Sequence, residues 1–163
     1  GRLRGYATLA DGYHPSSPEP EGRWEQRVME MAIESADLPG GADDVDAVVA
    51  HGTGTPAGDI AELAALNRIY GKRGEPMRVM SPKGNFGHPH GPAGALGLLV
   101  GLYSMSESAL MPTAGTYDER ELMPEVGALR VPINEPAEGR IDALQVNAFG
   151  FGGQNSSLVV TRD

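Results

Sequence analysis

Three glycine-rich turns carry the side chains of this sequence that could do chemistry. The candidates are, in chain order, His51, Thr53, Thr55, Lys83, His88, His90, Asn147, Phe149, Phe151 and Asn155. The first two turns each follow a predicted strand, and the carboxyl ends of parallel strands meet at one edge of an α/β sheet. We therefore expect His51 and the Lys83 turn to face a common crevice.

Two histidines and a lysine suit the stabilisation of an oxygen that gains negative charge. A neutral imidazole can donate a hydrogen bond to such an oxygen. His88 lies just before a predicted helix, and a helix N-terminus disfavours the imidazolium form. The positive charge of Lys83 also disfavours the imidazolium form of a nearby histidine. The combination suits an enolate or oxyanion formed from a thioester, whereas a surface or capping role is expected for His90.

Other ligand classes fit these turns poorly. The stretch GTGTPAGD after His51 lacks the Gly-Lys-Ser/Thr ending of a P-loop, and its third glycine is misplaced for a dinucleotide fingerprint. His88 and His90 have no cysteine or nearby carboxylate to complete a zinc set. We expect no metal site and no bound cofactor.

Composition argues against several further classes of function. The chain has 163 residues, a net charge of −9 and no cysteine. Without cysteine it has no disulfide, no thiolate metal site and no thiol nucleophile. The acidic charge disfavours nucleic acid as a partner, no apolar run is long enough to span a bilayer, and the N-terminus does not resemble a signal peptide. We expect a cytoplasmic protein without a membrane or nucleic-acid partner.

The elements that must position the three turns alternate in type along the chain. Strands are predicted at 3–9, 45–50, 78–80, 141–148 and 155–161, and helices at 24–38, 58–70 and 93–106. This order is typical of an α/β unit with a mostly parallel core and a terminal hairpin. Most of 109–140 is predicted to be loop, with an extended piece near 128–131. The third helix is apolar nearly all round, so we expect it to present a large apolar face that needs covering.

Three motifs in this order resemble those of the β-ketoacyl synthase family. HGTGTPAGD at 51–59 resembles its HGTGT motif, KGNFGHPHGPAG at 83–94 its Lys-x4-His loop, and NAFGFGGQNSSL at 147–158 its Phe-Gly-Phe-Gly-Gly signature. The resemblance covers essentially the whole chain, residues 1–163, as the C-terminal half of a synthase. It implies one βαβαβαββ half of a thiolase-like α/β fold, with a mixed five-stranded sheet and helices on both faces. Gly84 departs from the serine that the family commonly has there.

The family resemblance implies a decarboxylative Claisen condensation. An acyl chain is taken up by a cysteine, two histidines assist decarboxylation of a malonyl thioester, and the enolate attacks the acyl group. The residues that the resemblance implies are His51, His88 and Lys83 for catalysis, and Thr53, Thr55, Phe149 and Phe151 for substrate binding. The two threonines would bind the pantetheine arm of a carrier protein or coenzyme A, and Phe151 would be the gate of the acyl pocket.

The family's cysteine belongs to the N-terminal half, and this chain has none. We therefore expect the chain to be inactive alone and to need that half, on the same or a separate polypeptide. The resemblance implies an acyl carrier protein as a partner, a homo- or heterodimer, and a pathway of fatty acid or polyketide synthesis. The alternative is a non-catalytic partner subunit, similar to a chain length factor, that shapes the acyl pocket. A stand-alone α/β binding domain is a third hypothesis, and the retained histidines and lysine favour the enzyme.

Overall fold

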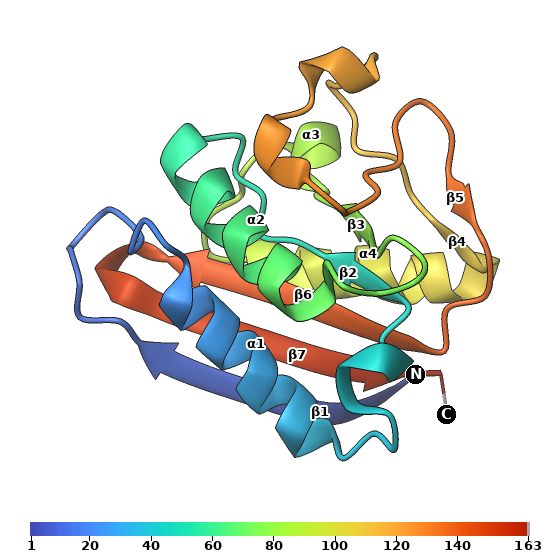
Figure 1. Cartoon of the computed structure of the whole chain (residues 1–163), viewed down its shortest axis with the longest axis horizontal. Coiled ribbons are helices and arrows are strands. Elements are labelled where there is room, and N and C mark those ends of the chain that lie inside the picture. Colours follow the sequence, from blue (N-terminus) through green and yellow to red (C-terminus); the bar gives the residue numbers. More distant parts are fainter. Residues whose placement is uncertain (163) are drawn as a thin grey trace.

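The fold is built on one mixed sheet of five strands. The computed structural model describes residues 1–162, and the sheet has the strand order β1-β7-β6-β2-β3 (Figure 1). The strands are β1 (Arg2–Ala10), β2 (Ala47–Val49), β3 (Arg78–Met80), β6 (Ala143–Gly150) and β7 (Gln154–Thr161). β2 pairs in parallel with β3 and β6, whereas β7 is antiparallel to both of its neighbours. The predicted parallel core and terminal hairpin are confirmed.

Helices cover both faces of this sheet, as expected. The long helices are α1 (Arg23–Ala36), α2 (Pro56–Tyr70) and α4 (Ala93–Glu107). α1 and α2 lie on one face and α4 on the other (Figure 1). Val28 and Met29 of α1 belong to one buried apolar cluster, together with residues of α2 and the sheet. Val100 of α4 and Leu144 of β6 belong to a second cluster on the opposite face.

α4 lies close to the sheet because it carries glycine where it meets β6. A Cβ atom at Gly101 would collide with the Leu144 side chain. On the other side of the helix, Leu99 is 60% exposed and Tyr103 is 56% exposed. The apolar face predicted for this helix is therefore exposed at the surface. No helix within residues 1–162 combines the length and the apolar character needed to cross a membrane.

Short elements inside the glycine- and proline-rich segments escaped sequence reasoning. They are α3 (Lys83–Phe86), β4 (Ala109–Leu110), β5 (Ala137–Glu138) and the 3-10 turns η1 (Gly41–Asp44), η2 (Glu119–Glu121), η3 (Pro124–Val126) and η4 (Phe151–Gly153). Elements of two to four residues are too short to show a helical or strand periodicity. The extended piece near 128–131 is confirmed by a bridge between Arg130 and Arg78 of β3.

Glu25, in the first turn of α1, is a buried carboxylate in acidic surroundings. It is 1% exposed, and its Oε2 atom has no hydrogen-bond partner within residues 1–162. Burial, and then the charges of Asp11, Glu62 and Glu19, raise the pKa of Glu25 to about 7. Because the unfolded chain ionises this group near pH 4.5, ionisation opposes folding as the pH rises from 4.5 to 7.

Replacing Glu25 with glutamine is therefore expected to stabilise the protein at high pH. The gain should be small below pH 4.5 and reach about 2–3 kcal/mol above pH 7. Thermal unfolding from pH 4 to pH 8.5 measures this gain. The difference in melting temperature between the variant and the original protein should widen as the pH rises. Glu34→Gln, at an exposed position of the same helix, is the control and should shift the melting temperature little. A constant difference at all pH values would contradict the prediction.

Candidate active site

His51 follows β2, and Lys83 reaches it from the turn that follows β3. Because β2 and β3 are adjacent and parallel, the two turns start at the same edge of the sheet. Lys83 Nζ lies 3.2 Å from His51 Nδ1 and also donates a hydrogen bond to the His51 carbonyl oxygen. The prediction that the two turns meet is confirmed.

His88 joins this pair from the loop between α3 and α4. Its ring centroid lies 5.6 Å from that of His51, and the two rings are nearly perpendicular, at 83°. On another side of His88, the ring of His90 is stacked with a centroid distance of 4.6 Å and an angle of 20°. His90 is exposed, as predicted, but it lies against a candidate catalytic residue.

Hydrogen bonds place the proton on the same nitrogen in both candidate histidines. An ammonium group only donates, so His51 Nδ1 is the acceptor in its contact with Lys83. The backbone N–H of His90 donates to His88 Nδ1 at 3.2 Å. Each neutral ring therefore carries its proton on Nε2, which is available to donate to a ligand oxygen.

Burial and positive neighbours favour the neutral form of both histidines. Burial first, and then Lys83 and His88, lower the pKa of His51 to about 3. The pKa of His88 is also lowered, by burial and then by Lys83 and His90. The predicted effect of Lys83 is confirmed. The predicted effect of a helix N-terminus on His88 should be weak, because α4 begins only at Ala93 and such effects fall off within one turn.

Glu62 of α2 fixes the backbone of the first turn. Its two carboxylate oxygens accept from the backbone N–H of His51 at 2.9 Å and of Gly52 at 2.8 Å. The Asn147 side-chain amide donates to the same carboxylate at 3.0 Å. Glu62 is only 3% exposed; burial raises its pKa, while these three donors act in the opposite direction. A fully hydrogen-bonded carboxylate thus holds His51 in place.

A buried chain of polar side chains extends this support into the core. The Tyr70 hydroxyl donates to Gln145 Oε1 at 2.6 Å, and Gln145 Nε2 donates to Ser157 Oγ at 3.0 Å. Ser157 Oγ donates in turn to Asn147 Oδ1 at 2.9 Å, and Asn147 donates to Glu62. This polar chain, defined as Tyr70, Gln145, Ser157, Asn147 and Glu62, connects α2, β6 and β7 to the His51 turn.

The predicted substrate-binding threonines lie together at the start of α2. Thr53 Oγ1 and Thr55 Oγ1 are 2.8 Å apart. Asp59, in the first turn of α2, accepts from the Gly54 N–H at 3.2 Å and from the Thr53 hydroxyl at 3.5 Å. Thr55 is exposed and Thr53 is half-buried, so both hydroxyls are within reach of a ligand.

The two predicted phenylalanines differ in their surroundings. The Phe149 ring lies 5.7 Å from the His51 ring, centroid to centroid. Phe151, two residues further, is 78% exposed at the tip of the third turn. Phe149 therefore belongs to the histidine cluster, whereas Phe151 stands apart from it at the surface.

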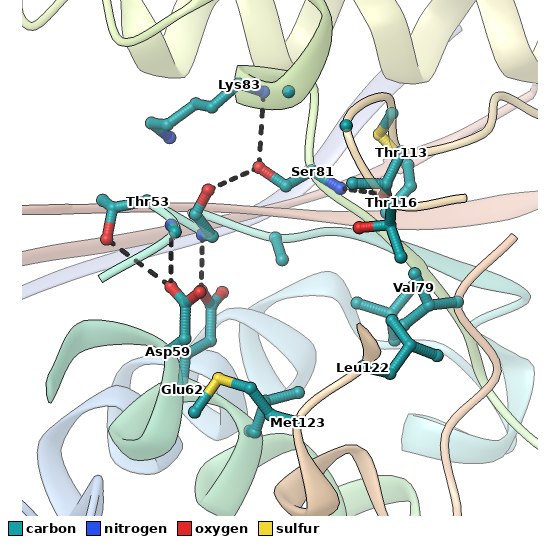
Figure 2. A pocket seen from close by; sticks show the side chains of 18 of the residues that line it. Thr53, Asp59, Glu62, Val79, Ser81, Lys83, Thr113, Thr116, Leu122 and Met123 are labelled. Carbon is teal, nitrogen blue, oxygen red and sulfur yellow. Dashed lines mark hydrogen bonds between the residues drawn. The ribbon is translucent and has the colours of Figure 1, made fainter. Parts of the chain in front are cut away.

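A cavity of about 560 Å³ opens beside the cluster, between α2, the Lys83 turn and the segment 113–131. Thr53, Lys83 and His88 line it among the predicted site residues. Figure 2 shows Thr53 and Lys83 on one side of this cavity and Leu122 on the other. The cavity therefore joins polar groups of the histidine site to an apolar wall.

Gly84 explains how the segment 113–116 comes so close to this cavity. A Cβ atom at Gly84 would collide with the backbone carbonyl oxygen of Ala114. Ser81 also contacts this segment, since its backbone N–H donates a hydrogen bond to Thr113 Oγ1 at 3.2 Å. The glycine that departs from the family pattern is thus required by the path of this segment.

Replacing Gly84 with serine is expected to displace the segment 113–116 and to cost about 1–3 kcal/mol of stability. The reason is the steric conflict between the new Cβ and the Ala114 carbonyl group. Thermal unfolding measures the loss. Gly91→Ser is the matched control, because a Cβ at Gly91 would meet no atom within 4 Å. Equal melting temperatures for the two variants would refute the expectation.

Glu62 and Asp59 are the site residues that sequence reasoning did not assign to the site. The signal for Glu62 was a charged residue on the buried side of a helix, next to Ala61, Ala65 and Leu66. A buried carboxylate needs partners, and the structure shows them to be the backbone of His51 and Gly52 and the side chain of Asn147. Within residues 1–162, no group of three or more acidic or histidine side chains could hold a metal ion.

Comparisons with known proteins agree with this geometry. Residues 1–116 match the family model described as beta-ketoacyl synthase, C-terminal domain. The chain is 36% identical over 157 residues to 3-oxoacyl-[acyl-carrier-protein] synthase 2 of Staphylococcus aureus, covering 95% of this chain and 37% of the relative.

Solved structures give the same result. A beta-ketoacyl synthase from Burkholderia phymatum STM815 has a TM-score of 0.87 and 32% identity, over 99% of this chain and 37% of that one. The ishigamide ketosynthase/chain length factor has a TM-score of 0.85 and 31% identity, over 98% and 37% of the two chains. The chain spans a little over a third of the length of each of these proteins. By sequence and by fold, the chain belongs to the β-ketoacyl synthase family.

Proposed function

We propose that this chain is the histidine-bearing part of a β-ketoacyl synthase that condenses an acyl thioester with a malonyl thioester. The observation that carries the proposal is the cluster of His51, His88 and Lys83, with both imidazoles neutral and both protons on Nε2. Two neutral donors beside one cation suit an oxygen that acquires negative charge without a proton transfer.

The first step is decarboxylation. The bond between the malonyl α-carbon and its carboxylate breaks, carbon dioxide leaves, and the electron pair moves into the thioester as an enolate. The Nε2–H groups of His51 and His88 donate to the enolate oxygen, where each such donor contributes about 2.7–4 kcal/mol. Lys83 orients His51 through Nδ1 and adds its positive charge to the site.

The second step is carbon–carbon bond formation. The enolate carbon attacks the acyl thioester on a cysteine, and the cysteine thiolate leaves. This chain has no cysteine, so another part of the protein, on the same or a separate polypeptide, supplies the nucleophile. Thr53 and Thr55 bind the phosphopantetheine arm of an acyl carrier protein or coenzyme A, while Phe149 lies beside the substrate and Phe151 is the gate of the acyl pocket.

The similarity to a ketosynthase/chain length factor supports one alternative, a non-catalytic subunit that shapes the acyl pocket. The histidine pair favours the catalytic role, because a subunit without chemistry has no need of two neutral donors on one site. The two functions differ in what the complete protein does to malonyl-carrier protein.

Incubation of the complete protein with malonyl-carrier protein tests the proposal. Mass spectrometry of the carrier should show conversion to acetyl-carrier in the absence of an acyl donor, and a β-ketoacyl product in its presence. The 163-residue chain alone should give no condensation product. A complete protein that converts nothing, but changes the product length of a partner ketosynthase, would support the chain-length-factor function.

A further inference from the structure

His90 has a structural feature that an exposed loop residue does not need. Its backbone φ is +55°, a left-handed conformation that is uncommon outside glycine and that asparagine, aspartate and histidine adopt more often than other residues. This turn directs the His90 N–H to His88 Nδ1 and brings the two rings into a stack. The left-handed turn at His90 therefore brings both its N–H and its ring into contact with His88.

His88 has few other contacts to hold it. It is exposed, and within residues 1–162 its one hydrogen bond is the one from the His90 backbone. The flanking Gly87 has a φ of +76°, and Gly91 brings no side chain. The edge-to-face contact with His51 and the stack with His90 are the ring contacts of His88.

We infer that the His90 imidazole is a positioning residue, which holds the His88 ring by stacking on it so that Nε2 faces the substrate. The inference rests on the proposed function, and it concerns a residue that the family resemblance does not place in the site. His90 touches neither of the reacting thioesters; it acts through His88.

The stack also affects the charge of His88. The titratable groups that face His88 are Lys83, His51 and His90. A charged His90 disfavours a second charge on the ring stacked against it. This agrees with the lowered pKa of His88, to which His90 contributes after burial and Lys83. Loss of the His90 ring should raise this pKa, and activity should then be lost at a higher pH on the acid side.

Two substitutions separate the ring from the backbone. Asparagine tolerates the left-handed conformation, so His90→Asn keeps the turn and removes the ring. His90→Phe keeps a stacked ring that cannot be protonated. His14→Asn is the control, because it removes an exposed histidine ring from a loop outside the histidine cluster.

In the complete protein, His90→Asn should lower the rate of malonyl decarboxylation about three- to tenfold, the range expected for one aromatic stack. The Michaelis constant for malonyl-carrier protein should stay unchanged, and the acid limb of the pH profile should move up. His90→Phe should retain most of the rate while showing the same movement of the acid limb. His14→Asn should match the original protein in both respects.

Nuclear magnetic resonance of the histidine Cε1–H groups gives a readout that does not depend on activity. The pKa of His88 should rise in His90→Asn and in His90→Phe, and stay constant in His14→Asn. If the original protein decarboxylates malonyl-carrier protein, and His90→Asn changes neither the rate nor the titration of His88, the positioning role is overturned. If the original protein has no activity, the proposed function fails, and the titration alone decides whether His90 controls His88.

Discussion

Replacing His88 with alanine is expected to lower malonyl decarboxylation by the complete protein about 100- to 1000-fold. The substitution removes one of two hydrogen-bond donors to the enolate oxygen, and losses of this size follow when one such donor is removed. The fold should survive, because the His88 side chain is exposed and its one hydrogen bond within residues 1–162 is with the backbone of its own loop. Release of carbon dioxide from labelled malonyl-carrier protein measures the rate.

His14→Ala is the control for this experiment, since it removes an exposed histidine from a loop outside the cluster. Circular dichroism of both variants should match that of the original protein. Undiminished decarboxylation by a folded His88→Ala protein would remove His88 from the proposed mechanism. Lys83→Ala should have a smaller effect, because Lys83 acts through His51 and through its charge.

The largest effect on stability is expected for Glu62→Ala. The change leaves three donors without an acceptor: the part-buried N–H groups of His51 and Gly52 and the buried Asn147 amide. Each buried donor left without a partner costs about 1–3 kcal/mol, so the three losses together should be large. Because the His51 backbone loses its anchor, decarboxylation should fall as well, even where the variant remains folded.

Hydrogen exchange of the His51 and Gly52 amides measures the local effect directly. Both amides should exchange much faster in Glu62→Ala, and Glu62→Gln should give an intermediate result, because an amide keeps one acceptor oxygen. Glu75→Gln, at an exposed position after α2, should leave both amides unchanged. Slow exchange of both amides in Glu62→Ala would show that the carboxylate does not hold this turn.

The order of the long elements could be predicted because each has a clear pattern. The apolar run at 45–50, interrupted by Asp46, indicated a buried strand, and the apolar period of α1 indicated a helix on one face. The meeting of His51 and Lys83 followed from a rule about parallel strands. The roles of these side chains stay predictions.

Contacts between distant segments could not be predicted. The path of 113–116 across Gly84 depends on backbone packing that leaves no periodic signal in the sequence. The stack of His90 on His88 depends on one positive φ angle in a short loop, which no sequence period indicates. Glu62 could have been suspected from its position on a buried helix face, but its three partners come from two other parts of the chain.

The polar chain from Tyr70 to Glu62 has a consequence for the register of the terminal hairpin. Gln145 and Asn147 are two residues apart on β6, so they point to the same face, and Ser157 on β7 pairs with Asn147. A slip of β6 by one residue would turn both side chains to the opposite face and leave Glu62 without Asn147. Correct pairing of β6 is thus a condition for holding the His51 turn in place. Molecules with a mispaired β6 would lack a correctly positioned His51.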